Sequence, residues 1–547
     1  MAIFKISSSS ALGTLPSVIT STGDAFFTDS PLVADTLIVD SGAFLITTDT
    51  TPDAAGAHLA ATGAWNATIN GFVFGADDGI LLSSGNAAPS LIKVGQFGNV
   101  IGGASYGIFA QSSATINNAG SILGGAIGIA SLGNGTLTVN NRGTIAGSTG
   151  GDAISDLSVG GTKDSVINAG TINGNVFLNL GNDSFANTAT TNGLVDLGDG
   201  ANTLTNSGHI GDNGAGISVQ SGAGIDLITN SGTLTGGLST SGSNDVVTDF
   251  ALSGGVVVSG TINGTIDLGA GDDKFFGGAN SETVTDGDGS DTINLGGGND
   301  TYFAAGATAD GADRIAGGAG IDTYDASGAT TELRVNLDTV NHGLANVPGP
   351  LYTFDVVKSS ATSIIPANPV GPVVGTGSDT ITGFENFEGG NNKDIVFGNA
   401  AANVLSGNGG ADNLWGLGGN DTLEGGDGND CIGGGAGKDS LTGGTGNDTF
   451  FYFLTSDSGN ALATRDVITD FQSGLDVINL KGIETNSNVT FTFRGSFTGL
   501  AGDLRATNIA GGELIQGDTN GDKVADFSIF IKDAPHTITF TAADFVL

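Results

Sequence analysis

A strict nine-residue repeat runs from Gly389 to Phe451 and constrains the fold of this chain more than any other feature. Seven successive units start at positions 389, 398, 407, 416, 425, 434 and 443, and the most regular ones read GLGGNDTLE, GGDGNDCIG, GGAGKDSLT and GGTGNDTFF. An acidic residue falls at one phase of the repeat, at Asp394, Asp412, Asp421, Asp430, Asp439 and Asp448, with Asn403 at the missing step. The units follow GGxGxDxUx, with U apolar, a pattern typical of calcium-binding parallel β-helices. A flexible glycine-rich linker would not place an apolar residue two positions after each Asp.

The repeat predicts a six-residue turn followed by a three-residue strand, so that two units close one coil of 18 residues. Glycine permits the positive φ angles that such turns need. Residues 18 apart should stack at one strand spacing, about 4.8 Å. The U positions should point inward and form a thin apolar core, at Leu414, Leu423, Ile432, Leu441 and Phe450. The acidic positions should form two stacks, Asp394/412/430/448 on one edge and Asn403/Asp421/439 on the other.

These stacks predict that folding depends on a cation. Two carboxylates about 5 Å apart repel by about 3 kcal/mol at an effective dielectric constant near 20. Carboxylate and turn carbonyl oxygens are hard ligands in a flexible shell, which suits calcium better than zinc or magnesium. We therefore expect several calcium ions between the stacked turns, and a weaker site where Asn403 interrupts its stack.

Composition excludes several classes of protein. The 547 residues carry 16 basic and 56 acidic side chains, a net charge of −40, which argues against nucleic-acid binding because phosphate contacts need Lys/Arg clusters. A hydrophobic content of 38% is sufficient for a core. The single cysteine, Cys431, excludes an internal disulfide framework and is expected to be an exposed, unreactive thiol. No apolar run approaches the length of a membrane span, and the first 20 residues do not resemble a cleaved signal peptide.

A looser repeat upstream predicts a second solenoid. Its copies include NNAGSILGG (117–125), NNRGTIAGS (140–148), NAGTINGN (168–175) and NSGTLTGG (230–237). Intervals of 19 to 28 residues match one coil of a parallel β-helix with three short strands, and the repeated Asn can form side-chain ladders. The expected fold is all-β, a right-handed parallel β-helix running into a calcium-binding parallel β-roll. The expected segments are a β cap (1–65), the β-helix (66–266), a first nonapeptide cluster (267–325), an excursion loop with strands (326–388), the β-roll (389–451) and a C-terminal domain (452–547).

The first nonapeptide cluster supplies further candidate calcium ligands. Its units read LGAGDDKFF, GGANSETVT, DGDGSDTIN and LGGGNDTYF, and opposed pairs 273/291 and 282/300 are expected. The candidates are Asp273, Glu282, Asp291 and Asp300, followed after a four-residue insertion by Asp313 and Asp322. Residues 326–378 break the period and hold five of the ten prolines, which favours a variable, functional loop.

These stretches, together with DVITDFQSGLDVINL (466–480), GDTNGDKVADFSIFI (517–531) and the final DFVL, resemble the RTX family of type I secreted proteins. The C-terminal part is similar to the corresponding domain of serralysin-type metalloproteases, well over 390–547 and less well over 267–390. The resemblance implies a β-roll, bound calcium, and an uncleaved C-terminal signal that the type I secretion machinery reads. In DTNGD, Asp518, Asn520 and Asp522 have the alternate spacing of a calcium loop, although a polar β-turn is the competing interpretation.

Motifs for catalysis are weak or absent. The four histidines, at 58, 209, 342 and 536, form no HExxH, so the resemblance does not extend to zinc proteolysis. The sequence GASYG at 103–107 matches a nucleophile elbow but lies in a β-helix coil, where that motif has no suitable context. Parallel β-helices can host polysaccharide lyases and epimerases, and the candidates here would be Arg142, Asp152 and Asp156.

The sequence therefore predicts a secreted, calcium-binding, non-enzymatic structural protein of a cell surface or extracellular matrix, exported without a cleaved N-terminal signal. Flat repeating faces and open sheet ends favour self-association into an S-layer-like lattice or a filament. A calcium-dependent adhesin that binds a glycan or cell-surface polysaccharide is the first alternative. A polysaccharide lyase or epimerase is the second.

Overall fold

The computed structural model describes residues 3–6, 18–21, 27–30, 36–48, 54–61, 64–83, 89–148, 150–211, 214, 216–253, 255–304, 311–338, 342–343, 355–356, 360–364, 378–533 and 538–547. The chain forms two compact units, Met1–Val284 and Thr285–Leu547. Much of the predicted excursion loop lies outside the described residues. The proposed segment boundaries remain predictions.

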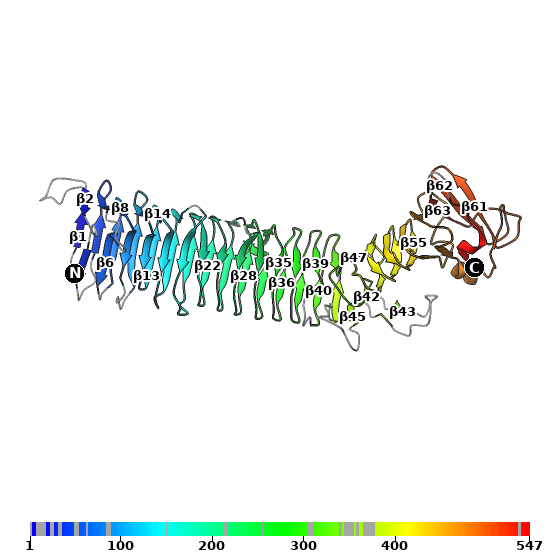
Figure 1. The fold of residues 1–547 in the computed structure, drawn as a ribbon, viewed down its shortest axis with the longest axis horizontal. Helices are drawn as coiled ribbons and strands as arrows, with labels where there is room; N and C mark the ends of the chain where they lie inside the picture. Colours follow the sequence, from blue (N-terminus) through cyan, green and yellow to red (C-terminus); the bar gives the residue numbers. More distant parts are fainter. Residues whose placement is uncertain are drawn as a thin grey trace. The chain divides into compact units, whose positions relative to one another are not determined.

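Unit 1 is a parallel β-helix in which each coil contributes one strand to each of three sheets (Figure 1). Strands pair in parallel at equivalent positions of successive coils, as Ile116 does with Ile92 and Val139. The first sheet contains β1 (Ile3–Ile6), β4 (Thr36–Val39), β7 (Asn66–Ile69), β10 (Ser90–Val94), β13 (Ala114–Asn118), β16 (Leu137–Asn141), β19 (Ser165–Asn168), β22 (Ser184–Asn187), β25 (Thr203–Asn206), β28 (Leu227–Asn230), β31 (Val246–Thr248) and β36 (Lys274–Phe276).

The other two sheets of unit 1 follow the same order along the chain. The second contains β2 (Val18–Ser21), β5 (Phe44–Thr47), β8 (Phe72–Gly75), β11 (Asn99–Gly102), β14 (Ser121–Leu123), β17 (Thr144–Ala146), β20 (Thr171–Asn173), β23 (Thr190–Asn192), β26 (His209–Ile210), β29 (Thr233–Leu234) and β34 (Thr261–Ile262). The third contains β3 (Phe27–Ser30), β6 (Ala55–Ala61), β9 (Asp78–Leu82), β12 (Tyr106–Ala110), β15 (Ile127–Ser131), β18 (Asp152–Asp156), β21 (Asn175–Phe177), β24 (Val195–Asp196), β27 (Ile217–Gln220), β30 (Gly237–Ser239) and β35 (Ile266–Asp267), and β37 (Thr283–Thr285) spans the unit boundary.

Alternating burial along each short strand builds the core of unit 1. Residues two apart face inward, as in β13, where Ala114, Ile116 and Asn118 are buried. Asn118 begins the predicted amide ladder, in which each Nδ2 donates to the Oδ1 of the Asn one coil further along at 2.7–2.8 Å. The ladder runs through Asn118, Asn141, Asn168, Asn187, Asn206 and Asn230, and it closes the corner between the first and second sheets with its amide groups paired.

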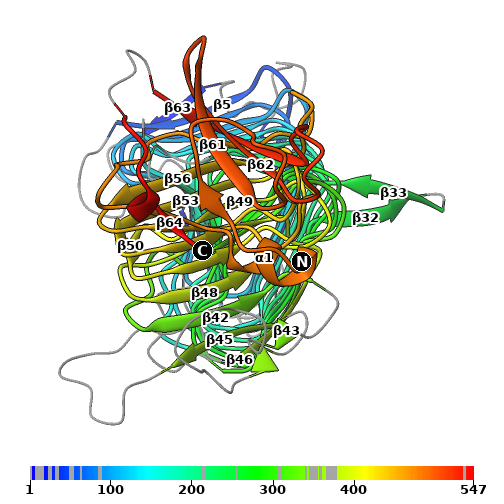
Figure 2. The same cartoon turned by 90° about the vertical axis from the view of Figure 1, so that its right-hand side faces the viewer.

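Two features of unit 1 go beyond the sequence prediction. The described strands within residues 1–65 pair in parallel with the coils that follow, so we propose that this segment caps the β-helix as its first coils. An antiparallel hairpin, β32 (Phe250–Ser253) and β33 (Val256–Ser259), projects sideways from the coils (Figure 2). The hairpin exposes apolar side chains, with Leu252 73% and Val256 65% accessible.

Unit 2 begins as a solenoid with two sheets in place of three. One sheet contains β38 (Thr292–Asn294), β40 (Arg314–Ala316), β42 (Glu332–Asn336), β46 (Ser378–Thr382), β48 (Asp394–Phe397), β51 (Asn413–Trp415), β54 (Cys431–Gly433), β57 (Thr449–Phe451), β59 (Val477–Asn479) and β64 (Phe545–Val546). The other contains β39 (Thr301–Phe303), β41 (Thr323–Asp325), β47 (Asn386–Glu388), β49 (Val404–Ser406), β53 (Thr422–Gly428), β56 (Ser440–Thr445), β58 (Val467–Ile468) and β63 (Phe527–Lys532). The predicted 18-residue register is confirmed, since Leu414 pairs with Val396 and Ile432.

The remaining elements of unit 2 extend or cover these sheets. β45 (Ser360–Ile364) pairs antiparallel with β42 and β46, and β61 (Asp503–Ile509) and β62 (Gly512–Asp518) pair antiparallel before β63. The shorter elements are β43 (His342–Gly343), β44 (Asp355–Val356), β50 (Gly409–Gly410), β52 (Gly418–Gly419), β55 (Ala436–Gly437), β60 (Thr492–Phe493), the helix α1 (Lys481–Ser487) and a 3-10 turn (Ala542–Asp544). Among the described residues, no helix is both long and apolar enough to cross a membrane.

Candidate metal centres

The repeat aspartates of unit 2 lie in two stacked rows, each residue directly before or at the start of a strand. In the first row, the backbone N–H of Asp394 donates to Oδ1 of Asp412 at 2.7 Å, Asp412 to Asp430 at 2.8 Å, and Asp430 to Asp448 at 3.0 Å. In the second row, Asn403 donates to Asp421 at 2.8 Å and Asp421 to Asp439 at 2.9 Å. All seven side chains are at most 1% exposed. The rows hold the carboxyl groups one coil apart and away from bulk water.

One oxygen of most of these carboxyl groups lacks a hydrogen-bond donor. Oδ1 accepts the ladder bond, whereas Oδ2 is buried without a partner in Asp412, Asp421, Asp430, Asp439 and Asp448. Asp394 differs because Leu333 and Gly390 donate backbone N–H groups to its Oδ1 and Oδ2. A buried carboxylate oxygen without a donor is costly unless a cation or a proton satisfies it.

The first glycine of each unit leaves space around that oxygen. A Cβ built on Gly425 would lie 2.3 Å from Oδ2 of Asp430 and 2.6 Å from the carbonyl oxygen of Gly443. At Gly416 the corresponding distances are 2.2 Å to Oδ2 of Asp421 and 2.6 Å to the Gly434 carbonyl oxygen. The space beside each of these two glycines, here called the cradle, therefore brings together a carboxylate oxygen and a carbonyl oxygen from the next coil. Such oxygen ligands fit calcium, and the glycine is required to keep the cradle open.

Burial controls the ionisation of these groups. It raises the pKa of Asp412 to about 8, of Asp421 to about 7, and of Asp430 and Asp439 to about 6, while backbone N–H bonds act in the opposite direction. Neighbouring carboxylates add to the increase for Asp412, through Asp394 and Asp430. Protons therefore compete with a cation for the same oxygens near neutral pH.

Asn403 interrupts the second row as predicted from its sequence. Its Oδ1 accepts the N–H of Asn399 at 2.9 Å and its Nδ2 donates to the Glu385 carbonyl at 2.6 Å. An amide can satisfy itself in this turn, because it carries both a donor and an acceptor. The weaker calcium site proposed here therefore has one fewer anionic ligand.

Sequence reasoning missed two members of the rows. The N–H of Asp439 donates to Oδ1 of Asp466, and that of Asp448 donates to Oδ1 of Asp476. Their spacings of 27 and 28 residues depart from the 18-residue spacing of the other row members. A signal was nevertheless present, because each begins an Asp-Val-Ile triplet whose Ile, at 468 and 478, is fully buried like the other U positions. Burial raises the pKa of Asp466 to about 9.

The earlier cluster repeats this arrangement within unit 2. Asp291 donates its N–H to Oδ1 of Asp313 at 2.7 Å, and Asp300 to Oδ1 of Asp322 at 2.9 Å. Asp286, which replaces the first glycine of its unit, brings a third carboxyl oxygen within 4.8 Å of those of Asp291 and Asp313. Asp273 and Glu282 are buried in unit 1, so their predicted pairing with Asp291 and Asp300 remains a prediction.

The DTNGD loop forms a self-contained turn. Both oxygens of Asp518 accept backbone N–H groups, Oδ1 from Asn520 and Gly521 and Oδ2 from Lys523. Oδ1 of Asn520 accepts the N–H of Asp522 at 2.8 Å. These hydrogen bonds are sufficient to stabilise the turn without an ion. A calcium site at Asp518, Asn520 and Asp522 remains a prediction.

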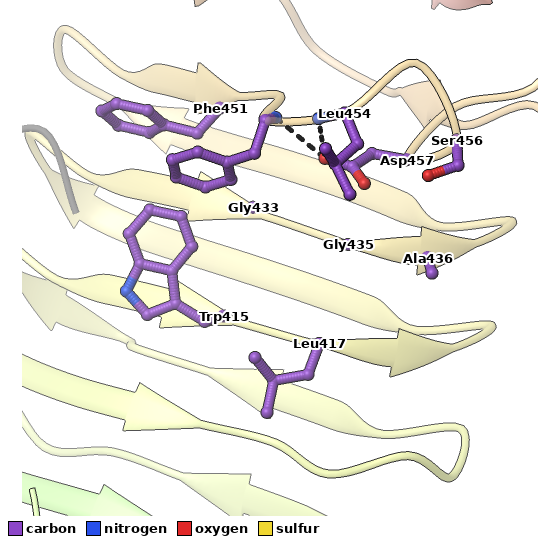
Figure 3. A pocket seen from close by; sticks show the side chains of 10 residues that line it. Trp415, Leu417, Gly433, Gly435, Ala436, Phe451, Leu454, Ser456 and Asp457 are labelled. Carbon is purple, nitrogen blue, oxygen red and sulfur yellow. Dashed lines mark hydrogen bonds between the residues drawn. The ribbon is translucent and has the colours of Figure 1, made fainter. Parts of the chain in front are cut away.

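An aromatic pocket of about 280 Å³ lies beside the turns of the β-roll (Figure 3). Trp415, Phe451 and Phe453 form its aromatic part, with Trp415 and Phe451 ring centroids 5.5 Å apart. Oδ2 of Asp457 accepts the N–H groups of Phe453 and Leu454 at its rim. Cys431 packs against the same cluster and is half-buried, which corrects the expectation of an exposed thiol.

Two of the candidate catalytic residues of unit 1, Asp152 and Asp156, lie in the strand β18, and the third, Arg142, lies outside it. Asp156 is buried in β18, where its carboxylate accepts hydrogen bonds from Ser131 at 2.6 Å and from Ser158. Arg142 is exposed in the turn between β16 and β17, which belong to the other two sheets. Asp156 therefore serves as a structural acceptor.

Comparison with known families explains the repeats. The model of the serralysin C-terminal region of peptidase M10 matches residues 279–547, and the RTX calcium-binding nonapeptide repeat matches residues 263–281. No curated protein sequence matches the chain. The RTX repeats identify calcium as the cation that such turns bind, and both matches indicate a protein of type I secretion.

Three solved structures are similar to parts of the chain. Two are subunits of an Azotobacter vinelandii mannuronan C5-epimerase: AlgE6R3, with 30% identity over 28% of this chain and 78% of that one (TM-score 0.16), and AlgE6R2, with 23% identity over 28% and 91% (TM-score 0.19). The third is the extracellular lipase LipA of Serratia marcescens, with 18% identity over 56% of this chain and 45% of that one (TM-score 0.19). These TM-scores are too low to support an argument about activity.

Proposed function

We propose that this chain, a secreted calcium-binding protein that carries RTX repeats and a serralysin-type C-terminal region, is a non-enzymatic structural protein that self-assembles outside the cell. It folds on calcium after export and forms an S-layer-like lattice or a filament at the cell surface or in the extracellular matrix. The observation that carries the folding step is the double row of buried carboxyl groups whose Oδ2 atoms lack a donor.

Calcium concentration gives this folding step its direction. In the cytosol, where calcium is scarce, ionised carboxylates one coil apart oppose closure of the β-roll and keep the chain extended for export. Outside the cell, calcium at millimolar concentration occupies weak extracellular-class sites. The free energy of metal binding then becomes free energy of folding.

The projecting hairpin of unit 1 supports the assembly step. Leu252, Val256, Val257 and Val258 are 40–73% exposed on two strands that pair only with each other in the described structure. An isolated two-stranded hairpin is marginally stable in water, and exposed strand edges can pair with another chain. Contact with a second copy would cover this apolar surface.

Light scattering over a calcium titration tests the assembly. We expect the purified full chain to be monomeric in EGTA and to form large particles above calcium saturation. Replacing Leu252 and Val257 by Ser should weaken the particles without changing calcium-induced β structure, whereas replacing the exposed Leu462 of unit 2 by Ser should not. A wild-type chain that stays monomeric up to tenfold above saturation would contradict the proposal.

A calcium-dependent adhesin is the second candidate, and the aromatic pocket supports it. Tryptophan is enriched at binding interfaces, and the pocket combines Trp415 and Phe453 with the polar side chains of Ser456 and Asp457. A glycan array in calcium and in EGTA, run with wild type and Phe453→Ala, tests this function. We expect binding that needs both calcium and Phe453, and an array without calcium-dependent hits would contradict it.

A further inference from the structure

A third row of buried aspartates lies in unit 1; it begins upstream of both family matches and leads to Asp273 inside the RTX match, whose Oδ1 accepts the N–H of Asp245 at 2.5 Å. Asp164, Asp183, Asp226 and Asp245 directly precede β19, β22, β28 and β31 of the first sheet and are at most 2% exposed. The N–H of Asp164 donates to Oδ1 of Asp183 at 2.6 Å, and that of Asp226 to Oδ1 of Asp245 at 2.7 Å. Oδ2 of all four is buried without a hydrogen-bond partner.

Asn202 occupies the middle of this row. Its Nδ2 stands where the aspartates have Oδ2, so its hydrogen bonds show which groups surround that position. The N–H of Asp183 donates to its Oδ1 at 2.8 Å, and its own N–H donates to Oδ1 of Asp226 at 2.7 Å. Its Nδ2 donates to the carbonyl oxygens of Gly198 at 3.0 Å and Gly200 at 3.1 Å. Two backbone carbonyl oxygens of the turn therefore face Nδ2 of Asn202.

The Asp183 turn and the Asn202 turn have positive φ angles at the same two positions. Four residues before each side chain, φ is 67° at Asn179 and 70° at Gly198. Two residues before, φ is 155° at Gly181 and 124° at Gly200. The carbonyl groups of residues 179 and 181 should thus face Oδ2 of Asp183 as those of Gly198 and Gly200 face the Asn202 amide. By this analogy, three oxygens would converge at Asp183 at the place where the Asn202 turn has an N–H donor.

We infer that this edge of the β-helix holds a row of divalent cation sites of the calcium class. The best-defined site is at Asp183, and the Asn202 turn binds no cation because the side-chain amide takes its place. Carboxylate and carbonyl oxygens in a backbone turn are the ligands that calcium prefers. A surface pocket lined by Gly161, Lys163, Gly181 and Asp199 opens on the same turns. The sites lie outside the family matches and do not depend on the proposed assembly.

The Asn ladder and the Asp row of unit 1 differ in a way that supports cation sites in the Asp row. The Asn ladder satisfies itself, because each amide donates to the next. The Asp row cannot when it is ionised, because an ionised carboxylate only accepts hydrogen bonds. Asn202 demonstrates that an amide is sufficient for the ladder bond in this row, so the carboxylates are not needed for that bond. A cation gives the second oxygen of each carboxylate a partner.

Local hydrogen exchange of the full chain at pH 7.5 tests the inference, using calcium alone as the probe. In wild type, peptides covering residues 179–206 should exchange at least tenfold more slowly in calcium than in EGTA. Asp183→Asn should keep the fold, as Asn202 does, and should lose this calcium response at residues 179–183. Asn202→Asp should gain a response at residues 198–202, with one more ion bound in equilibrium dialysis. Asp40→Asn, which removes a partly exposed carboxylate of unit 1, should change neither.

Three results would overturn the inference: exchange at 179–206 that does not respond to calcium in wild type, a full response retained in Asp183→Asn, or no added ion in Asn202→Asp. The exchange is measured in the Leu252→Ser/Val257→Ser background, which removes the proposed contact between copies, so that these results do not depend on whether copies assemble.

Discussion

The backbone N–H of Asp412 donates to Oδ1 of Asp430 at 2.8 Å, while Oδ2 of both side chains is buried without a donor. One oxygen thus fixes the register between two coils, and the other is left for a cation. This division of roles repeats at the five aspartates from Asp412 to Asp448. It links the folding of the repeat to the ion that completes it.

Replacing one row aspartate by its amide should uncouple stability from calcium. In Asp430→Asn the ladder acceptor is kept, but an anionic ligand and its repulsion are both removed. We expect the increase in Tm between EGTA and calcium to become smaller, and the calcium midpoint of folding to rise about tenfold, equivalent to about 1.4 kcal/mol. Asp427→Asn removes the same charge from an exposed position of the same turn and should behave as wild type. Equal midpoints for the two variants would argue against a calcium role for Asp430.

Adding a methyl group to the cradle should block its cation. In Gly425→Ala the Cβ would meet Oδ2 of Asp430 and the Gly443 carbonyl oxygen, both closer than any real contact allows. We expect fewer bound ions by isothermal titration calorimetry and a lower Tm in calcium. The control is Gly495→Ala, whose Cβ meets nothing within 4 Å. A Gly425→Ala protein with wild-type stoichiometry would place the ion elsewhere.

The inward apolar column should carry most of the packing energy of the roll. Ile432 is fully buried and pairs with Leu414 and Phe450 on adjacent strands. Ile432→Ala should therefore cost about 2–5 kcal/mol in urea unfolding of the calcium-bound protein. Leu462→Ala, at a position 76% exposed, should change stability by less than about 0.5 kcal/mol. A similar small loss for both would show that the column is not the core of the roll.

Without calcium, the roll should be more stable at pH 6 than at pH 8. The folded-state pKa values of about 6 to 8 for Asp430, Asp421 and Asp412 lie above the unfolded value near 4, so protonation favours the folded state. This stabilisation is complete below about pH 4 and is lost as the pH rises through about 6 to 8. With calcium the trend should reverse, because protons and calcium compete. Circular dichroism of calcium-free protein checks this through the amount of β structure, and equal β content at pH 6 and pH 8 would contradict it.

The repeat made the β-roll predictable because its period fixes which residues face inward. Leu414 and Phe450 are buried as that phase requires, and Asp412 and Asp430 stack 18 residues apart. Asp466 and Asp476 escaped prediction because an insertion after Tyr452 destroys the spacing, although the Asp-Val-Ile triplets survive. A regular period identifies residues at constant spacing, but it does not identify structurally equivalent residues that follow an insertion.

Other features depend on contacts that one sequence does not reveal. The cradle at Asp183 became visible only through the hydrogen bonds of Asn202, since neither residue falls in a regular nonapeptide. The coils within residues 1–65 lack the Asn-Gly copies that mark later coils, so their pairing could not be inferred from a motif. Trp415 follows the inward residue Leu414 and packs on the outer face of the strand against Phe451, a contact that the nine-residue period does not predict.

Circular dichroism of the full chain at pH 7.5, in excess EGTA and after addition of calcium, tests calcium-gated folding most directly. The account predicts that β structure in unit 2 is largely lost in EGTA and returns with calcium, with hydrogen exchange assigning the change to residues 389–480. A spectrum and exchange pattern that are the same in EGTA and in calcium would contradict it.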